Sequence, residues 1–311
     1  MLDLLRRSAL GALALLALGS AAQAQAQTQP AADPNRLFAD SRLVVRDRFS
    51  DEIVGRGPDV VFIPGLASSR ATWKATAERL RGRYRLHLIQ VAGFSGEPAR
   101  ANASGDILIP TAEAIDAYLV SERLAPATVV GHSLGGTMAL YLAEHHPEHL
   151  KKAMVVDALP FFGALQGPAV TAETIKPMAA QVRDMMAKGG PAYAANLQPV
   201  IKGMITSEAD QKMGLGWGVS SDPSVVARAY YDDLTLDLRP GLSTIRTPIV
   251  LLYPDNAPNG APAGATERVY PPLYAAAPSV KLKLVANSKH FIMLDQPQAF
   301  ADDLDAFLAQ P

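Results

Sequence analysis

The sequence lacks cysteine altogether, in a chain of 311 residues. Without a thiol, the protein has no disulfide framework, no thiolate nucleophile, no thiolate metal ligand and no cysteine-borne lipid anchor. An excess of charge of one sign is lacking as well, because 29 Lys and Arg residues face 30 Asp and Glu residues. The formal net charge of -1 creates no basic field of the kind that captures nucleic acid, so nucleic acid is not an expected partner.

Apolar residues make up 49% of the chain and charged residues 19%. The mean hydropathy of +0.07 is typical of a globular protein that buries a substantial core. Residues 9–18 form an apolar run, but this is about half of the roughly 20 residues that a membrane-spanning helix needs. We therefore expect no membrane span in the mature protein.

The N-terminal segment has the pattern of a secretory signal peptide. Arg6 and Arg7 precede the apolar run, and two overlapping Ala-Gln-Ala sequences follow it at residues 22–24 and 24–26. The residues that usually flank a twin-arginine signal are missing, so the general secretory route is favoured. We predict a signal peptide over residues 1–26 and a periplasmic or secreted protein.

Beyond a polar leader over residues 27–41, for which the simple composition predicts disorder, β-rich runs alternate with helical patterns. Strands are predicted at residues 60–63, 84–90, 127–130, 153–156, 249–253 and 280–285, and helices at 71–80, 107–124, 134–145, 265–276 and 298–308. This alternation is typical of an α/β protein with a mostly parallel sheet and helices on both faces.

The alternation pauses at residues 159–238, which we interpret as a helical cap inserted into a core of residues 42–158 and 239–311. The segment has no clear strand and contains five of the nine Met residues, and glycine-rich breaks at residues 189–191 and 214–218 would divide it into short helices. Flexible Met side chains suit an apolar lid over a pocket, and they suit the cap's own small core equally well.

The stretch with the clearest chemical meaning is Gly-His-Ser-Leu-Gly at residues 131–135, a G-x-S-x-G sequence. The bare motif is weak, but here it follows a β-branched strand and precedes a helical pattern. A sharp strand-to-helix turn needs glycine on both sides of the serine, and it holds the hydroxyl out at the end of the strand. Ser133 is therefore the candidate nucleophile.

With this motif, residues 42–308 resemble the α/β-hydrolase superfamily. The resemblance implies an α/β-hydrolase fold and an oxyanion hole made by two backbone amides. Residues 62–66, Phe-Ile-Pro-Gly-Leu, follow the early strand where that family carries a His-Gly loop, so Pro64 replaces the histidine. By position, the oxyanion amides are those of Leu66 and Leu134.

A serine nucleophile needs a base, and the sequence offers six histidines. His290 follows the last predicted strand, in a segment that resembles the family's histidine loop, and is the candidate base. His87 falls within a predicted strand, and His132 adjoins the serine but is expected to point elsewhere.

The other three histidines, His145, His146 and His149, raise the question of a metal site. Pro147 interrupts the helical register that would align them, so we expect surface side chains instead. The chemistry expected of this sequence requires neither a metal nor a cofactor.

The base in turn needs an acid at its other ring nitrogen. Asp255 follows the penultimate predicted strand, so the order Ser133, Asp255, His290 matches the order that the resemblance implies. Asp157, at the end of the preceding strand, is the rival acid, because some members of the superfamily take their acid from there. Glu267 is a more distant alternative.

The expected reaction is acyl transfer to water through an acyl-enzyme, on a carboxylic ester with an apolar acyl or alcohol part. A lactonase is the alternative enzyme, and amidases, thioesterases and C–C bond hydrolases share the same three residues. A non-catalytic ligand-binding protein is the alternative from another class. The candidate substrate-binding residues are Phe94, Trp73, Phe161 and Trp217.

Overall fold

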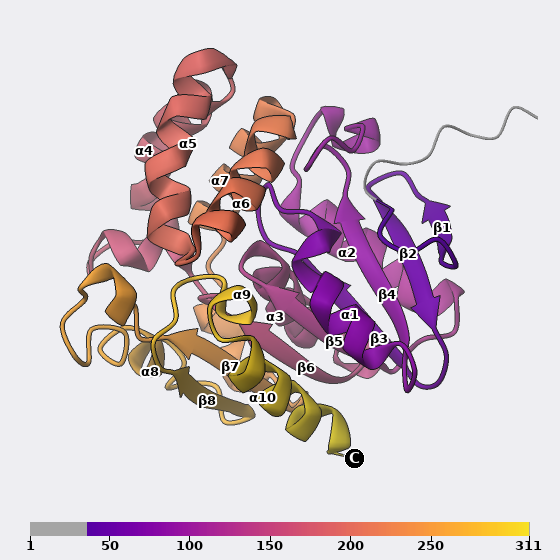
Figure 1. Cartoon of the computed structure of the whole chain (residues 1–311). Helices are drawn as coiled ribbons and strands as arrows, with labels where there is room; N and C mark the ends of the chain where they lie inside the picture. Colours follow the sequence, from indigo (N-terminus) through magenta and orange to yellow (C-terminus); the bar gives the residue numbers. More distant parts are fainter. Residues whose placement is uncertain (1–35, 311) are drawn as a thin grey trace, which may run out of the picture. The chain divides into compact units, whose positions relative to one another are not determined.

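The computed structural model describes residues 36–310, which form an eight-stranded sheet in the order β1-β2-β4-β3-β5-β6-β7-β8 (Figure 1). The pairs β1–β2 and β2–β4 are antiparallel, and all other neighbours are parallel. The predicted α/β class with a mostly parallel sheet is thereby confirmed. The strands are β1 (Arg42–Val45), β2 (Phe49–Gly55), β3 (Asp59–Ile63), β4 (Arg85–Val91), β5 (Ala127–His132), β6 (Leu150–Val156), β7 (Ile249–Pro254) and β8 (Val280–Val285).

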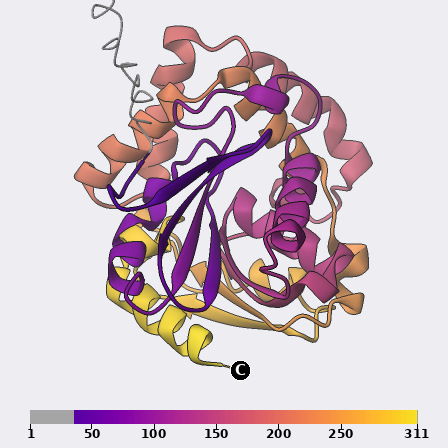
Figure 2. The same ribbon diagram turned by 90° about the vertical axis from the view of Figure 1, so that its right-hand side faces the viewer.

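Alternating side chains of the strands face the two sides of the sheet, which gives the protein two large cores. In β3, Val61 and Ile63 belong to one core, whereas Val60 and Phe62 belong to the other. Residues of α2 and α3 cover the first core and residues of α1 and α10 the second, and Figure 2 shows these helices on opposite sides of the strands. The α-helices outside the insertion are α1 (Lys74–Leu80), α2 (Leu108–Ser121), α3 (Leu134–His145), α8 (Tyr270–Leu273), α9 (Ile292–Asp295) and α10 (Pro297–Ala309).

Between β6 and β7 the chain forms four α-helices, in which α4 packs on α7 and α5 on α6. Side chains of Thr171, Ser207 and Asp222 accept hydrogen bonds from first-turn amides and so fix where α4, α6 and α7 begin. The expected helix break at residues 214–218 is absent, because these glycines lie inside α6. The helices are α4 (Ala172–Met186), α5 (Gly190–Met204), α6 (Glu208–Ser220) and α7 (Pro223–Thr235).

Short 3-10 helices join many of these elements. They are η1 (Arg70–Trp73), η2 (Arg100–Ala103), η3 (Pro147–His149), η4 (Phe162–Gln166), η5 (Arg239–Thr244) and η6 (Ala257–Asn259). The predicted helix at residues 265–276 is reduced to the four residues of α8, because Pro271 and Pro272 lack the amide hydrogens that a longer helix needs.

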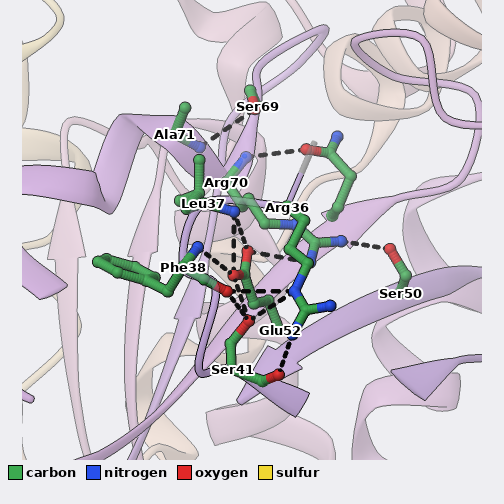
Figure 3. A network of polar contacts seen from close by, with 10 residues as sticks. Arg36, Leu37, Phe38, Ser41, Ser50, Glu52, Ser69, Arg70 and Ala71 are labelled. Carbon is green, nitrogen blue, oxygen red and sulfur yellow. Dashed lines mark hydrogen bonds and ion pairs between the residues drawn. The ribbon is translucent and has the colours of Figure 1, made fainter. Parts of the chain in front are cut away.

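The predicted leader over residues 27–41 is wrong for its last part, because residues 36–41 are hydrogen-bonded to β2 (Figure 3). Glu52 accepts from the amides of Leu37 and Phe38 at 2.8 to 2.9 Å and from the Ser41 hydroxyl at 2.6 Å. Its carboxylate also lies 3.6 Å from the Arg70 guanidinium, and both side chains are fully buried. Glu52 thus fastens the start of the folded chain to the sheet.

The predicted signal peptide over residues 1–26 lies outside the described residues. Among residues 36–310, none of the helices combines the length and the apolar composition that a membrane crossing requires.

Candidate active site

The G-x-S-x-G sequence forms a strained turn between β5 and α3. Ser133 has φ 51° and ψ −123°, a conformation that side-chain-bearing residues adopt rarely. A Cβ atom at Gly131 would lie 2.1 Å from the carbonyl oxygen of Gly135, and one at Gly135 would lie 2.4 Å from the carbonyl oxygen of Ile63. Only glycine fits at these two crossings, and the turn leaves Ser133 partly exposed at the end of β5.

The loop after β3 passes directly beside this serine. A Cβ atom at Gly65 would lie 3.0 Å from the Cβ of Ser133, and the Ser68 amide closes a turn by donating to the Gly65 carbonyl at 3.2 Å. The Leu66 amide lies in this turn, and the Leu134 amide opens α3, where the first amides have no acceptor within the helix. The loop that contains Leu66 therefore adjoins Ser133, and Leu134 follows Ser133 directly in the chain.

His290 and Asp157 are in direct contact. Nδ1 of His290 lies 2.7 Å from Oδ2 of Asp157, and the Nε2 atom has no hydrogen-bond partner among the residues described. Asp157 directly follows β6, and the Ser133 amide donates to the Val156 carbonyl at 2.9 Å. The carboxyl ends of β5 and β6 therefore bring the serine and the histidine–carboxylate pair to the same edge of the sheet.

The expectation that Asp255 holds this histidine is wrong. Its carboxylate accepts instead from the amides of Ala257 and Asn287, each at 2.9 Å, and so joins the loops that follow β7 and β8. The rival assignment, Asp157, is the one that the structure supports. The more distant alternative, Glu267, accepts from the Thr266 hydroxyl at 3.2 Å.

Tyr270 holds the second oxygen of Asp157 and was not foreseen in the sequence. Its hydroxyl donates to Oδ1, while the histidine takes Oδ2, so both oxygens of the carboxylate have a donor. Burial first, and then the Asp157 charge, raise the pKa of the Tyr270 phenol well above its usual value. The phenol therefore stays a donor and fixes the orientation of the carboxylate.

His132 contacts His290, which corrects the expectation that its side chain points away from this residue. Its Nε2 donates to the His290 carbonyl oxygen at 3.1 Å, and its ring centroid lies 4.6 Å from those of His290 and Phe291. Burial, and then the nearby His290, lower the pKa of His132 well below its usual value. A neutral His132 thus supports the histidine loop without competing for the proton.

A second carboxyl group lies near the site, on α7 of the insertion. One oxygen of Asp233 is buried without a partner, and burial raises the pKa of its carboxyl to about 6. A hydrogen bond from Thr137, which is on α3 one turn after Ser133, and the nearby His290 oppose this rise, whereas Asp232 adds to it. No sequence pattern pointed to this residue, because its proximity to His290 depends on how α7 packs.

The residues expected to bind substrate lie mostly in the cores. Trp73 has no exposed surface and packs on Phe62 and Phe300, and Phe94 and Phe161 are also fully buried. Trp217 is 9% exposed, and its ring centroid lies 6.4 Å from that of Phe291, next to the histidine loop. Of the four candidates, only Trp217 keeps exposed surface beside the site; the other three fill the interior instead.

The histidine loop is also fastened to the insertion. Asp295 accepts from the amides of Lys289 and Thr206, at 2.7 and 2.9 Å, and the Phe291 amide donates to the Met204 carbonyl at 3.2 Å. Lys289 in turn donates from Nζ to the Lys202 carbonyl at 2.8 Å. Hydrogen bonds therefore tie the junction of α5 and α6 to the loop that carries His290.

The doubly wound sheet, with a strained serine after a central strand and the histidine loop after the last one, defines the class of α/β hydrolases. Residues 60–303 match the model of the Alpha/beta hydrolase family, and the chain belongs to that family.

Curated relatives cover most of the chain. It is 25% identical over 271 residues to the pimeloyl-[acyl-carrier protein] methyl ester esterase of Vibrio atlanticus, an alignment that spans 82% of this chain and 96% of the relative. The protein of the same name from Nitrosomonas europaea is 25% identical over 269 residues, with 82% and 97% covered.

Solved structures show the same fold at lower identity. A hydrolase from Pseudomonas aeruginosa superposes with a TM-score of 0.69 at 17% identity, over 88% of this chain and 99% of that one. The enol-lactonase from Burkholderia xenovorans gives a TM-score of 0.66 at 17% identity, over 84% and 96%.

Proposed function

We propose that the protein is a serine hydrolase that cleaves carboxylic esters through an acyl-enzyme. The observation that carries this proposal is the Asp157–His290 contact at the edge of the sheet where the elbow presents Ser133. No other histidine in the described residues combines a carboxylate on one ring nitrogen with a free second nitrogen at this edge.

The proposed reaction has two halves. Nε2 of His290 takes the hydroxyl proton of Ser133 as Oγ of Ser133 attacks the ester carbonyl carbon. The carbonyl electron pair moves to the carbonyl oxygen, which faces the Leu66 and Leu134 amides. The electron pair returns, the bond to the alkoxide breaks, and the imidazolium gives its proton to the leaving alcohol. Water then attacks the acyl-enzyme with the same base, which releases the acid and the free serine.

The amides contribute because negative charge develops on the carbonyl oxygen only as the reaction proceeds. The loss of one such donor typically costs about 3 to 4 kcal/mol of transition-state stabilisation. Asp157 keeps His290 in the tautomer with a proton on Nδ1 and stabilises the imidazolium that forms.

The proposed substrates are esters with an apolar acyl or alcohol part. Support comes from the curated relatives, which are named as methyl ester esterases, and from Trp217 of the insertion, which keeps exposed surface beside the histidine loop. Methyl and p-nitrophenyl esters with acyl chains from two to ten carbons are therefore the series to test.

The decisive experiment is intact-protein mass spectrometry before and after treatment with a fluorophosphonate, with ester hydrolysis measured on the same samples. Wild type should gain one adduct, and Ser133→Ala should gain none and lose hydrolysis. Ser104→Ala, which removes an exposed serine elsewhere, is the matched control and should behave as wild type. Equal labelling of wild type and Ser133→Ala, or no labelling at all, would contradict the proposal and favour a ligand-binding protein.

Acyl lactones, amides and thioesters are the second arm of that experiment. If Ser133 is labelled but lactones are turned over faster than every open-chain ester, the nucleophile stands and the substrate class becomes lactones.

We also propose that residues 1–26 direct export and are removed. The first hydrogen bonds of the described chain begin at Arg36, downstream of the proposed cleavage site, so removal would leave the anchor at Glu52 intact. Mass spectrometry of the periplasmic and culture fractions should show the shortened chain, and Leu15→Arg, which interrupts the apolar run, should abolish it. Full-length wild type confined to the cytoplasm would contradict export.

A further inference from the structure

A cluster of two histidines and an aspartate lies where α2 meets the turn between α3 and β6. Nδ1 of His149 is 2.8 Å from Oδ1 of Asp116, and Nδ1 of His146 is 3.6 Å from Oδ2 of the same carboxylate. One potential ligand atom from each residue lies within 4.8 Å of the other two. Donors around a tetrahedral zinc ion are about 3.3 Å apart, so the three groups need only small shifts to share one ion.

From the sequence we expected Pro147 to keep these histidines apart as surface side chains. Two of them remain partly exposed, but the structure brings them together. Pro147 starts the 3-10 turn η3, in which side chains three residues apart eclipse each other. His146 caps this turn and His149 ends it, and their rings stack with planes 4° apart and centroids 5.9 Å apart. His145 remains outside the cluster, with its ring stacked on Tyr141 at 4.1 Å.

A fourth side chain sets the orientation of one ring. Nε2 of His146 lies 3.0 and 3.1 Å from the two oxygens of Glu113, which also accepts from the Tyr141 hydroxyl at 2.6 Å. A hydrogen on Nε2 leaves the lone pair of Nδ1 directed at Asp116. Metal-bound histidines in proteins are held in this way, with a carboxylate on the nitrogen that does not bind the ion.

The cluster is also accessible. The side chains of His146, His149 and Asp116 are 23%, 26% and 11% exposed, so an ion can enter and a water can complete its coordination. Two imidazoles and one carboxylate are a donor set that suits zinc and its neighbours in the first transition row better than magnesium or calcium.

We propose that Asp116, His146 and His149 bind one divalent transition-metal ion of the zinc class, with Glu113 as the positioning residue. The ion joins α2 to the turn that leads into β6. Asp157 lies at the other end of β6, about 20 Å away for a seven-residue strand, so the ion takes no part in the ester chemistry. Its effect is on the stability of the fold.

The test uses the untagged chain, because a polyhistidine tag would itself bind metal. The protein is stripped with EDTA, the chelator is removed, and zinc chloride is titrated against a chromophoric competitor, with bound zinc counted by elemental mass spectrometry. We expect one zinc per chain and a melting temperature raised by about 3 °C or more. Cobalt in place of zinc should give the visible bands of a tetrahedral site.

Four variants separate a built site from adventitious binding. His149→Gln and Asp116→Asn should lose the stoichiometric ion and the cobalt bands, and Glu113→Gln should bind about tenfold more weakly. His145→Gln is the matched control and should bind zinc as wild type does. Ester hydrolysis should be the same before and after EDTA, so this proposal and that of a serine esterase fail separately.

The outcomes against the proposal are equally defined. Wild type without bound zinc would overturn it, and so would zinc uptake that is the same in wild type and His149→Gln. Because His149 is partly exposed and ends a surface turn, its variant should fold even if Asp116→Asn does not.

Discussion

Two tyrosine–aspartate–histidine networks lie in the described part of the protein, and only one of them is placed to do chemistry. At the carboxyl edge of the sheet, Asp157 joins the Tyr270 hydroxyl and Nδ1 of His290, whose side chain is 23% exposed. Its Nε2 has no partner among the described residues, so one ring nitrogen is held and the other is available.

The second network lies between β2, β4 and α2. Asp51 binds the Tyr118 hydroxyl and Nδ1 of His87, the latter at 3.1 Å, and Nε2 of His87 lies 3.0 Å from Asp59. The His87 side chain is 3% exposed and that of Asp51 is fully buried. Both ring nitrogens are occupied by carboxylates, and the hydroxyl next to Nδ1, that of Tyr118, is itself bound to Asp51.

The same three residue types therefore serve two purposes. A histidine held on one side only can exchange a proton with a neighbour, whereas a histidine held on both sides joins three elements of the fold. The comparison shows that an Asp–His contact is not sufficient evidence for a catalytic site; the free nitrogen and the strained serine complete it.

The largest effect should come from exchanging the two histidines in turn. His290→Gln removes the proposed base and should lower kcat/KM by about 10⁵-fold. His87→Gln should leave kcat/KM nearly unchanged when measured well below its melting temperature. Equal loss of activity in the two variants would contradict the different roles assigned to His290 and His87.

The next largest effect concerns the two acids. Asp157→Asn should lower kcat by about 10⁴-fold, because the histidine loses the group that fixes its tautomer. Asp255→Asn, which leaves the Asp157–His290 contact intact, should retain most of the activity. Steady-state kinetics on one p-nitrophenyl ester decide between them, and the opposite ranking would restore Asp255 as the acid.

These acids also show where prediction from sequence ended. The strand–helix alternation, the elbow at Ser133 and the loop of His290 were readable, because each depends on residues close together in the chain. Asp157 and Asp255 both follow parallel strands, so both are carried to the same edge, and only side-chain direction separates them. A local signal existed, since Asp255 precedes Asn256 and Pro258, a pattern that favours turns in which the aspartate caps backbone amides.

The antiparallel edge of the sheet was missed for a different reason. In β2, Ser50, Asp51 and Glu52 are fully buried, so polar residues occupy positions where a hydrophobic pattern would have indicated a strand. Their partners, among them Arg70 and His87, are distant in sequence. Long-range polar contacts of this kind leave no periodicity to detect.

The third prediction tests the buried network through stability. Burial lowers the pKa of His87, but hydrogen bonds to Asp51 and Asp59 outweigh it and raise this pKa overall. Burial raises the pKa of Asp59, but hydrogen bonds from His87 and Arg85 outweigh it and lower this pKa to about 2. The contribution of His87 to the free energy of unfolding is complete below about pH 6.5 and is lost as the pH rises through its raised pKa. The contribution of Asp59 is lost as the pH falls from about 4 to 2.

His87→Gln should therefore lower the free energy of unfolding by about 3 kcal/mol near pH 5.5 and by less at pH 9. Urea denaturation at both pH values measures the difference. A loss of stability that is equal at the two pH values would mean that the charge on His87 contributes nothing.

The fourth prediction concerns Asp233, the carboxyl beside the active site that has no full set of partners. Because its pKa is raised to about 6, the folded state binds more protons than the unfolded state between about pH 4 and 6, and stability falls as the pH rises through this range. Asp233→Asn should remove this dependence. Its free energy of unfolding relative to that of wild type should therefore rise by on the order of 2 kcal/mol from pH 4 to pH 7. Urea denaturation of both proteins at several pH values measures this difference, and a difference that stays constant with pH would contradict the raised pKa.

The smallest effects should come from the two tyrosines, and they separate the networks most finely. Tyr270→Phe removes one hydrogen bond to the Asp157 carboxylate and should lower kcat by about tenfold, with KM little changed. Tyr118→Phe should leave kcat unchanged and lower the free energy of unfolding by about 1.5 kcal/mol, because Asp51 loses a buried donor. If Tyr270→Phe lowered stability and left kcat unchanged, both tyrosine hydroxyls would serve only the fold. The two networks would then differ only in the free ring nitrogen of His290.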